Sequence, residues 1–170
     1  MINWDNIISN LSEGVDILPD PKNWNLNTKG YQEILDLWIK AEYNFSSIKW
    51  TNYYPDTHYS KDVETYYANE LNVKPLRSWI SSISPGYTAP WHWDVDDNED
   101  DYAAQGELVR YSIFMQDGKP GQVFMIENQS YYNQPAGTIV KWKNYRSWHA
   151  GANAGLTPKY MFHLIGVVDA

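Results

Sequence analysis

From residue 77 to residue 168 the chain reads as short apolar or alternating segments separated by turns. The turns carry glycine and proline, as at residues 85–86, 117–121 and 135–137. Alternating segments predict strands, because successive side chains of a strand point to opposite faces. We expect strands at residues 77–84, 91–94, 108–116, 122–127, 130–133, 138–142, 145–149 and 159–168. About eight short strands in this spacing indicate a mainly β jelly roll or barrel.

The N-terminal part of the chain follows a different pattern. Apolar residues recur at helical spacing after Thr28, a suitable N-cap, so we expect a helix over residues 29–44. This apolar face consists of Tyr31, Ile34, Leu35, Trp38 and Ile39. A shorter helix is expected over residues 61–71, and residues 1–27 read as an irregular arm with room for one short helix.

Length and composition fit one globular domain, residues 1–170, with the arm and helices in residues 1–76 and the jelly-roll core in residues 77–168. Hydrophobic residues make up 43% and charged residues 20%, which is typical of a packed domain. Aromatic residues make up 16%, and they favour strands. We expect the N-terminal helices to pack on one sheet of the core.

Charge and composition also narrow the class of protein. The absence of cysteine excludes disulfides, thiolate metal sites and cysteine nucleophiles. The net charge of −8 argues against a nucleic-acid partner. No apolar run approaches a membrane span, and the first residues lack the features of a signal peptide. We therefore expect a cytoplasmic protein with no nucleic-acid or membrane partner; the oligomeric state stays open.

The motif Trp91-His92-Trp93-Asp94 places an imidazole and a carboxylate two residues apart. In an extended strand, residues i and i+2 point to the same face, so His92 and Asp94 are expected to project together and the two tryptophans away from them. One histidine and one carboxylate are two thirds of the 2-His-1-carboxylate set that holds non-haem Fe(II).

A third ligand requires a histidine on a neighbouring strand, and the sequence offers two downstream of Asp94. His149 ends a predicted strand, before a glycine-rich loop, where the mouth of a barrel would lie. His163 lies among apolar residues in the middle of a predicted strand and is interpreted as a packed core histidine. Upstream, His58 lies in a polar loop and is interpreted as structural. The competing interpretation makes His92 and His149 ordinary buried aromatic residues.

Lys159 stands ten residues after His149, at the start of the last predicted strand. A fixed cation beside a metal can bind a carboxylate that reaches into the barrel. A 2-oxo diacid requires this arrangement, since one end chelates the metal while the other needs a positively charged partner.

The pattern His92-Trp-Asp94, then His149, then Lys159 resembles the signature of the 2-oxoglutarate- and Fe(II)-dependent dioxygenases, over residues 77–168. The resemblance implies a double-stranded β-helix (jelly roll) with Fe(II) on the first three residues and 2-oxoglutarate on Lys159. It also implies O2 as oxidant, stimulation by ascorbate, and hydroxylation of a peptide side chain, amino acid or other small molecule with release of succinate and CO2. Related halogenases lack the carboxylate that Asp94 supplies, so hydroxylation is favoured.

Two stretches resemble the aspartyl/asparaginyl β-hydroxylase-like branch of that family. Residues 108–113 are similar to a strand whose arginine, here Arg110, helps to bind 2-oxoglutarate, and the second stretch runs from Asn153 to Ile165. The chain departs from the branch by having Lys159 in place of arginine, Ser112 in place of a histidine, and a metal-binding carboxylate. Prolyl 4-hydroxylase-like proteins share the distal lysine, so both branches stay open. Arg146 is a weaker substitute for Arg110.

Other interpretations concern the surroundings of this site. Aligned as a calcium-binding loop from Asp94, the acidic run lacks glycine at the sixth position and glutamate at the twelfth. Residues 95–105 are then either a solvated loop or a lid over the metal. The aromatic side chains nearby form either a substrate pocket or part of the core: Trp91, Trp93, Trp148 and Tyr111. The alternative function is a cupin-like metal-binding protein without oxygenase activity, which has no need of a distal lysine.

Overall fold

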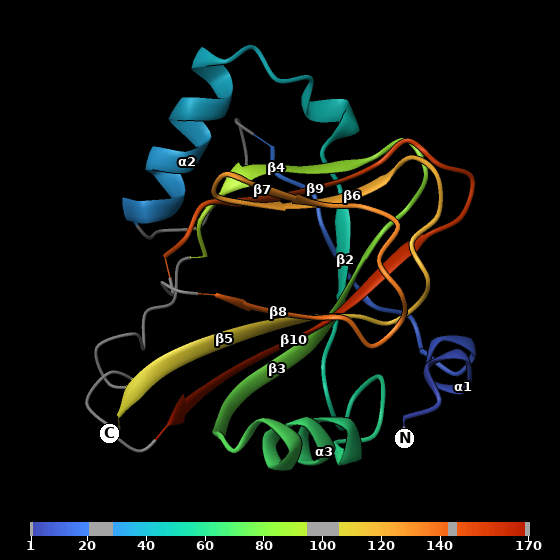
Figure 1. Cartoon of the computed structure of the whole chain (residues 1–170). Coiled ribbons are helices and arrows are strands. Elements are labelled where there is room, and N and C mark those ends of the chain that lie inside the picture. Colours follow the sequence, from blue (N-terminus) through green and yellow to red (C-terminus); the bar gives the residue numbers. More distant parts are fainter. Residues whose placement is uncertain (1, 21–28, 95–105, 143–145, 169–170) are drawn as a thin grey trace.

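Two antiparallel sheets face each other in the computed structural model, which describes residues 2–20, 29–94, 106–142 and 146–168 (Figure 1). The six-stranded sheet has the order β1 (Val15–Ile17), β2 (Trp50–Tyr53), β3 (Lys74–Ile83), β10 (Lys159–Val168), β5 (Glu107–Phe114), β8 (Ile139–Trp142). The four-stranded sheet has the order β4 (Thr88–His92), β9 (His149–Asn153), β6 (Gln122–Ile126), β7 (Gln129–Tyr131). The predicted mainly β jelly-roll class is confirmed.

The helices cover the outer faces of this sandwich. They are α1 (Trp4–Ser9), α2 (Lys29–Lys40) and α3 (Asp62–Leu71), with a short 3-10 turn at Phe45–Ser47. Figure 1 shows α3 against the six-stranded sheet and α2 on the far side of the four-stranded sheet. The helices therefore divide between the two sheets instead of sharing one. No helix in the described ranges is long and apolar enough to cross a membrane.

Strand β10 lies at the centre of the six-stranded sheet and is buried on both faces. Phe162 and Leu164 belong to the apolar cluster formed with α1 and α3, whereas Met161 belongs to the cluster between the two sheets. Because side chains alternate along a strand, Lys159 and His163 share the inner face with Met161. The packing of the core thus directs two polar side chains into the space between the sheets.

Several predicted elements differ from those observed. The helix expected over 29–44 ends at Lys40, and β1 and β2 were not expected. The strand predicted at 145–149 is wrong over residues 146–148, and residue 145 lies outside the described residues; β9 begins at His149 and continues through the stretch predicted to be a loop. A Cβ atom at Gly151 would lie 2.8 Å from Ile83 Cδ1, so this strand needs small residues where it approaches the other sheet. Its composition therefore resembles that of a loop.

Candidate metal centre and its cavity

His92, the last residue of β4, is the register partner of His149, the first residue of β9. The two imidazole rings lie 4.1 Å apart between centroids, because register partners of an antiparallel pair point to the same face. A bulge between Ala89 and His92 adds one residue to β4. This extra residue lets both Ala89 and His92 face the same cavity, although plain alternation would put them on opposite faces.

Asp94 lies two residues beyond the end of β4 and completes the cluster. Its Oδ1 lies 3.9 Å from His92 Nε2 and 3.8 Å from His149 Nε2. The three potential donor atoms all lie within 4.8 Å of one another. Two metal–ligand bonds of about 2.1 Å can bridge donors up to roughly 4.2 Å apart, so one ion between the carboxylate and either imidazole is sterically reasonable. The structure brings the three predicted residues together.

The other nitrogen of each imidazole contacts a backbone carbonyl. His92 Nδ1 lies 2.6 Å from the carbonyl oxygen of Pro90, and His149 Nδ1 lies 3.1 Å from that of Ser147. A carbonyl can only accept, so each Nδ1 carries the proton and each Nε2 presents its lone pair to Asp94. This is the tautomer that a metal ligand needs.

Burial keeps both imidazoles uncharged at neutral pH. It lowers the pKa of His92 to about 4 and that of His149 well below its ordinary value; the proximity of His92 lowers the latter further. Neutral imidazole is the form that binds metals, so the donor set fits a divalent ion that accepts nitrogen and oxygen ligands.

Arg110 contacts this cluster from the opposite sheet. The side chain is 1% exposed, and its Nη1 contacts Asp94 Oδ2, while Oδ1 faces the two histidines. The guanidinium carbon lies 3.8 Å from the ring centroid of Trp142 and 5.0 Å from that of Trp79. The sequence suggested that Arg110 binds a cosubstrate; the structure places its guanidinium on a candidate metal ligand.

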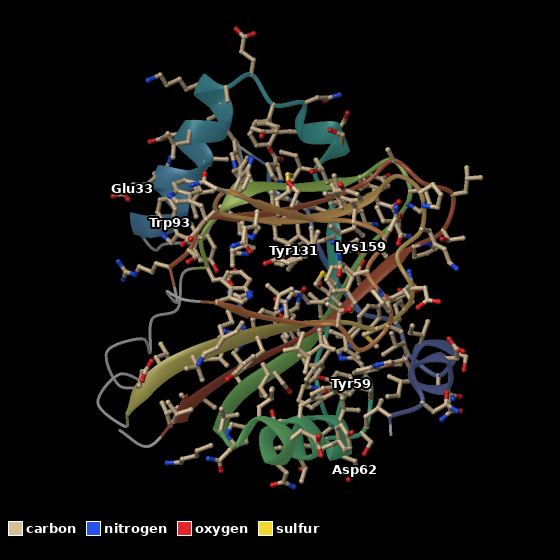
Figure 2. The ribbon with its side chains drawn as sticks, viewed as in Figure 1. Glu33, Tyr59, Asp62, Trp93, Tyr131 and Lys159 are labelled. Carbon is tan, nitrogen blue, oxygen red and sulfur yellow. The ribbon has the colours of Figure 1, made fainter. Side chains whose placement is uncertain are left out.

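Lys159 lies between the two sheets and is 5% exposed (Figure 2). Its Nζ donates to the carbonyl oxygen of Val123 at 2.9 Å and lies 5.3 Å from the ring centroid of Phe124. No acidic side chain among the described residues pairs with it. Burial therefore lowers the pKa of Lys159 to about 7, because the charged form has lost its water.

The metal cluster and Lys159 share one cavity of about 460 Å³. A Cβ at Gly151 would lie 3.4 Å from Lys159 Nζ, so the glycine keeps the ammonium group accessible beside β9. Gly151 follows His149 by two residues, a rise of roughly 6.6 Å along a strand. Lys159 Nζ therefore reaches the cavity beside the second residue of β9 after His149. Much of the remaining wall is aromatic: Tyr31, Trp38, Trp50, Tyr54 and Trp79.

His163 also lines the cavity, yet its ring nitrogens are both engaged. Nε2 lies 2.8 Å from Ser81 Oγ and Nδ1 lies 2.9 Å from Ser112 Oγ. The ring stacks on Trp79 at 4.9 Å. The interpretation of His163 as a packed histidine is confirmed. His58 is structural in the same sense, because its Nδ1 accepts from the backbone N–H of Tyr54 at 2.9 Å.

The four aromatic residues proposed from the sequence as a pocket do not line the cavity described here. Tyr111 belongs to the core cluster under the helices. Trp93 and Trp148 contact each other edge to face at 4.5 Å, and Trp93 packs with the α2 cluster. The cavity uses Trp50 and Tyr54 instead, in and just after β2, and no pattern in the sequence marks these two aromatic residues. The acidic run at 95–105 lies outside the described residues, so the lid and calcium interpretations stay predictions.

Comparison with known proteins gives structural likenesses alone. No protein-family model and no curated protein matches the chain. It is similar to a viral collagen prolyl hydroxylase from Paramecium bursaria Chlorella virus-1 in a 2OG complex, with 15% identity over 79% of this chain and 89% of that one and a TM-score of 0.49. A truncated form of that hydroxylase is similar with 17% identity over 93% of this chain and 95% of that one and a TM-score of 0.46. The chain is also similar to a predicted oxalate decarboxylase from Thermotoga maritima, with 12% identity over 71% of this chain and 82% of that one and a TM-score of 0.43. Likenesses this weak leave the function to be argued from the chain's own residues.

Proposed function

We propose that this protein is a 2-oxoglutarate-dependent, non-haem Fe(II) dioxygenase that hydroxylates a small molecule, an amino acid or a peptide side chain. The supporting observation is that one cavity contains His92, Asp94 and His149 together with a buried lysine that no described acidic residue neutralises. The overall reaction converts 2-oxoglutarate, O2 and R–H into succinate, CO2 and R–OH. One oxygen atom of O2 enters succinate and the other enters R–OH.

His92, Asp94 and His149 would hold the ion. When bound, Fe(II) would supply open coordination positions for the oxo acid and for O2. The protein's contribution is orientation: the carbonyl groups of Pro90 and Ser147 fix both imidazoles by their Nδ1 atoms. Ligands held in this way need little reorganisation when an ion arrives, which favours tight binding.

Lys159 would bind the distal carboxylate of 2-oxoglutarate. Among the described residues, its buried ammonium group has one hydrogen-bond partner, the backbone carbonyl of Val123, so an incoming carboxylate supplies the missing countercharge. A metal-binding protein without oxygenase activity would share the metal cluster but would have no use for this lysine. The aromatic wall would exclude water from the reacting groups and accommodate a mainly apolar substrate.

Succinate formation tests the proposed reaction. With Fe(II), ascorbate and O2, the purified protein is expected to convert 2-oxoglutarate into succinate slowly without a substrate and much faster with one. Mass spectrometry measures succinate formed per enzyme. The Asp94→Ala variant keeps both histidines but should lose most of this turnover, because the carboxylate is one of the three ligands. Equal rates of succinate formation in the wild type and in Asp94→Ala would refute the role of the cluster. If the wild type forms no succinate with any of a panel of amino acids and peptides, the metal-binding alternative is favoured.

The affinity for 2-oxoglutarate should depend on pH through Lys159. Because the pKa of Lys159 is lowered to about 7, the ligand-free protein carries a neutral amine above that pH. A bound carboxylate stabilises the ammonium form, so binding takes up a proton, and the affinity should fall about tenfold per pH unit above pH 7. Below that pH the amine is already protonated and the affinity should level off. Titration calorimetry of the Mn(II) form across this range measures the slope; a flat profile would contradict the assignment.

A further inference from the structure

Asp94 is poorly fixed by its own segment of chain. It lies beyond the end of β4, its side chain is 27% exposed, and the structure assigns it no place in either sheet. Its two carboxylate oxygens nevertheless have different surroundings: Oδ1 faces both histidines, whereas Oδ2 contacts Arg110. A carboxylate attached by one oxygen to a fixed cation has lost most of its freedom to rotate.

Arg110 is itself held rigidly. It lies in β5 and is 1% exposed. Its guanidinium group contacts the indole rings of both Trp142 and Trp79. Planar guanidinium groups stack well on aromatic rings, and burial between two indoles leaves little room for another rotamer.

A polar network fixes the two indoles in turn. Trp142 Nε1 donates to Ser112 Oγ at 2.9 Å, and Ser112 Oγ lies 2.9 Å from His163 Nδ1. His163 stacks on Trp79 with an interplanar angle of 24°, and its Nε2 lies 2.8 Å from Ser81 Oγ. This network, defined by Ser81, His163, Ser112 and Trp142, crosses four strands of the six-stranded sheet.

We propose that Arg110 is a positioning residue for the metal centre: it holds Asp94 by Oδ2 and so directs Oδ1 toward the Nε2 atoms of His92 and His149. This inference rests on the proposed function, because it takes His92, Asp94 and His149 as a metal site. The four-stranded sheet then supplies the two imidazoles, while the six-stranded sheet sets the direction of the carboxylate through the polar network. The carboxylate would bind through one oxygen, which leaves more of the ion open to the oxo acid.

Two effects of removing Arg110 have opposite signs, which makes the inference testable. Loss of a positive charge beside the ion would raise metal affinity by removing repulsion. Loss of orientation would lower it, and changes in groups that orient metal ligands typically cost about 10–100-fold in affinity. The positioning role therefore requires weaker binding in the variant.

The experiment measures Mn(II) affinity by the electron paramagnetic resonance signal of the free ion, with circular dichroism as a check of folding. Arg110→Gln is expected to bind Mn(II) about 10–100-fold more weakly than the wild type, with Arg110→Lys in between because it keeps the charge but loses the planar fork. Arg77→Gln is the matched control, since Arg77 also lines the cavity and lies over Trp79. Unchanged or tighter binding by Arg110→Gln would overturn the inference.

A double-mutant cycle with Asp94→Ala separates positioning from a structural role. If Arg110 acts through Asp94, then Arg110→Gln no longer weakens Mn(II) binding once Asp94 is alanine, and only the loss of charge repulsion remains, which leaves the affinity equal or higher. Equal losses in both backgrounds would overturn the inference, and Arg110→Lys completes the same cycle if the glutamine variant does not fold. The 2-oxoglutarate affinity of the wild-type Mn(II) form tests the proposed function separately. A variant that keeps Mn(II) affinity but loses 2-oxoglutarate affinity would return Arg110 to the cosubstrate.

Discussion

Replacing His149 with alanine is expected to weaken Mn(II) binding by more than about a hundredfold, beyond the 10–100-fold typical of groups that only orient a ligand. The reason is geometric. His149 is 5% exposed, its Nε2 faces Asp94 Oδ1, and no described residue next to it offers a replacement donor. The fold should survive, because His149 stands at the start of β9 and not in the apolar core. Titration with Mn(II), followed by the signal of the free ion, gives the affinity.

His58→Ala is the control for this variant. His58 is also partly buried and surrounded by aromatic rings, yet it does not line the cavity, so its removal should leave Mn(II) affinity unchanged. If the His149 variant binds Mn(II) as tightly as the wild type, the three-residue cluster is not the metal site.

Replacing Lys159 with methionine is expected to weaken 2-oxoglutarate binding by several hundredfold or more. A buried charge that loses its partner costs about 3–5 kcal/mol, and here the partner lost is the cation that faces the distal carboxylate. Methionine is apolar and of similar length, and Phe124 and Met161 already line this part of the cavity. The ligand-free variant should therefore be at least as stable as the wild type, since it no longer buries an ammonium group. Calorimetric titration of the Mn(II) form measures the affinity.

A matched cosubstrate provides the control for Lys159. 2-Oxopentanoate has the same chain length and metal-binding end as 2-oxoglutarate but lacks the distal carboxylate. It should therefore bind the wild type and the Lys159→Met variant with equal affinity. Lys119→Met, at an exposed turn, should leave both affinities as they are. Equal 2-oxoglutarate affinity in wild type and Lys159→Met would show that another residue binds the distal carboxylate.

The direction of several site residues follows from local rules and could be predicted from the sequence. Lys159 begins the last strand as expected, and alternation along β10 puts it on the same face as His163. The spacing of His92 and Asp94 predicted a shared direction, and their side chains do meet, although Asp94 lies outside the strand. Such features depend only on neighbours along the chain.

Features that depend on contacts between distant segments could not be predicted. The strand β9 looked like a loop because its glycine is required by Ile83, which lies far away in the sequence. The contact between Arg110 and Asp94 exists only because the two sheets face each other. The aromatic wall, including Trp50 and Tyr54, likewise requires the pairing of β2 with β3. Composition showed that aromatic side chains were abundant but not which of them would line the cavity.

The extra residue in β4 also ties strand pairing to metal chemistry. Without the bulge, or after a one-residue slip of β4 against β9, His92 would turn to the outer face and lie apart from His149. An ion that needs both imidazoles would bind only chains paired in the native register, and it would stabilise that register by an amount that grows with the logarithm of the free metal concentration. Metal binding would then favour the native register of β4 over a slipped one, and removing the metal would weaken this preference.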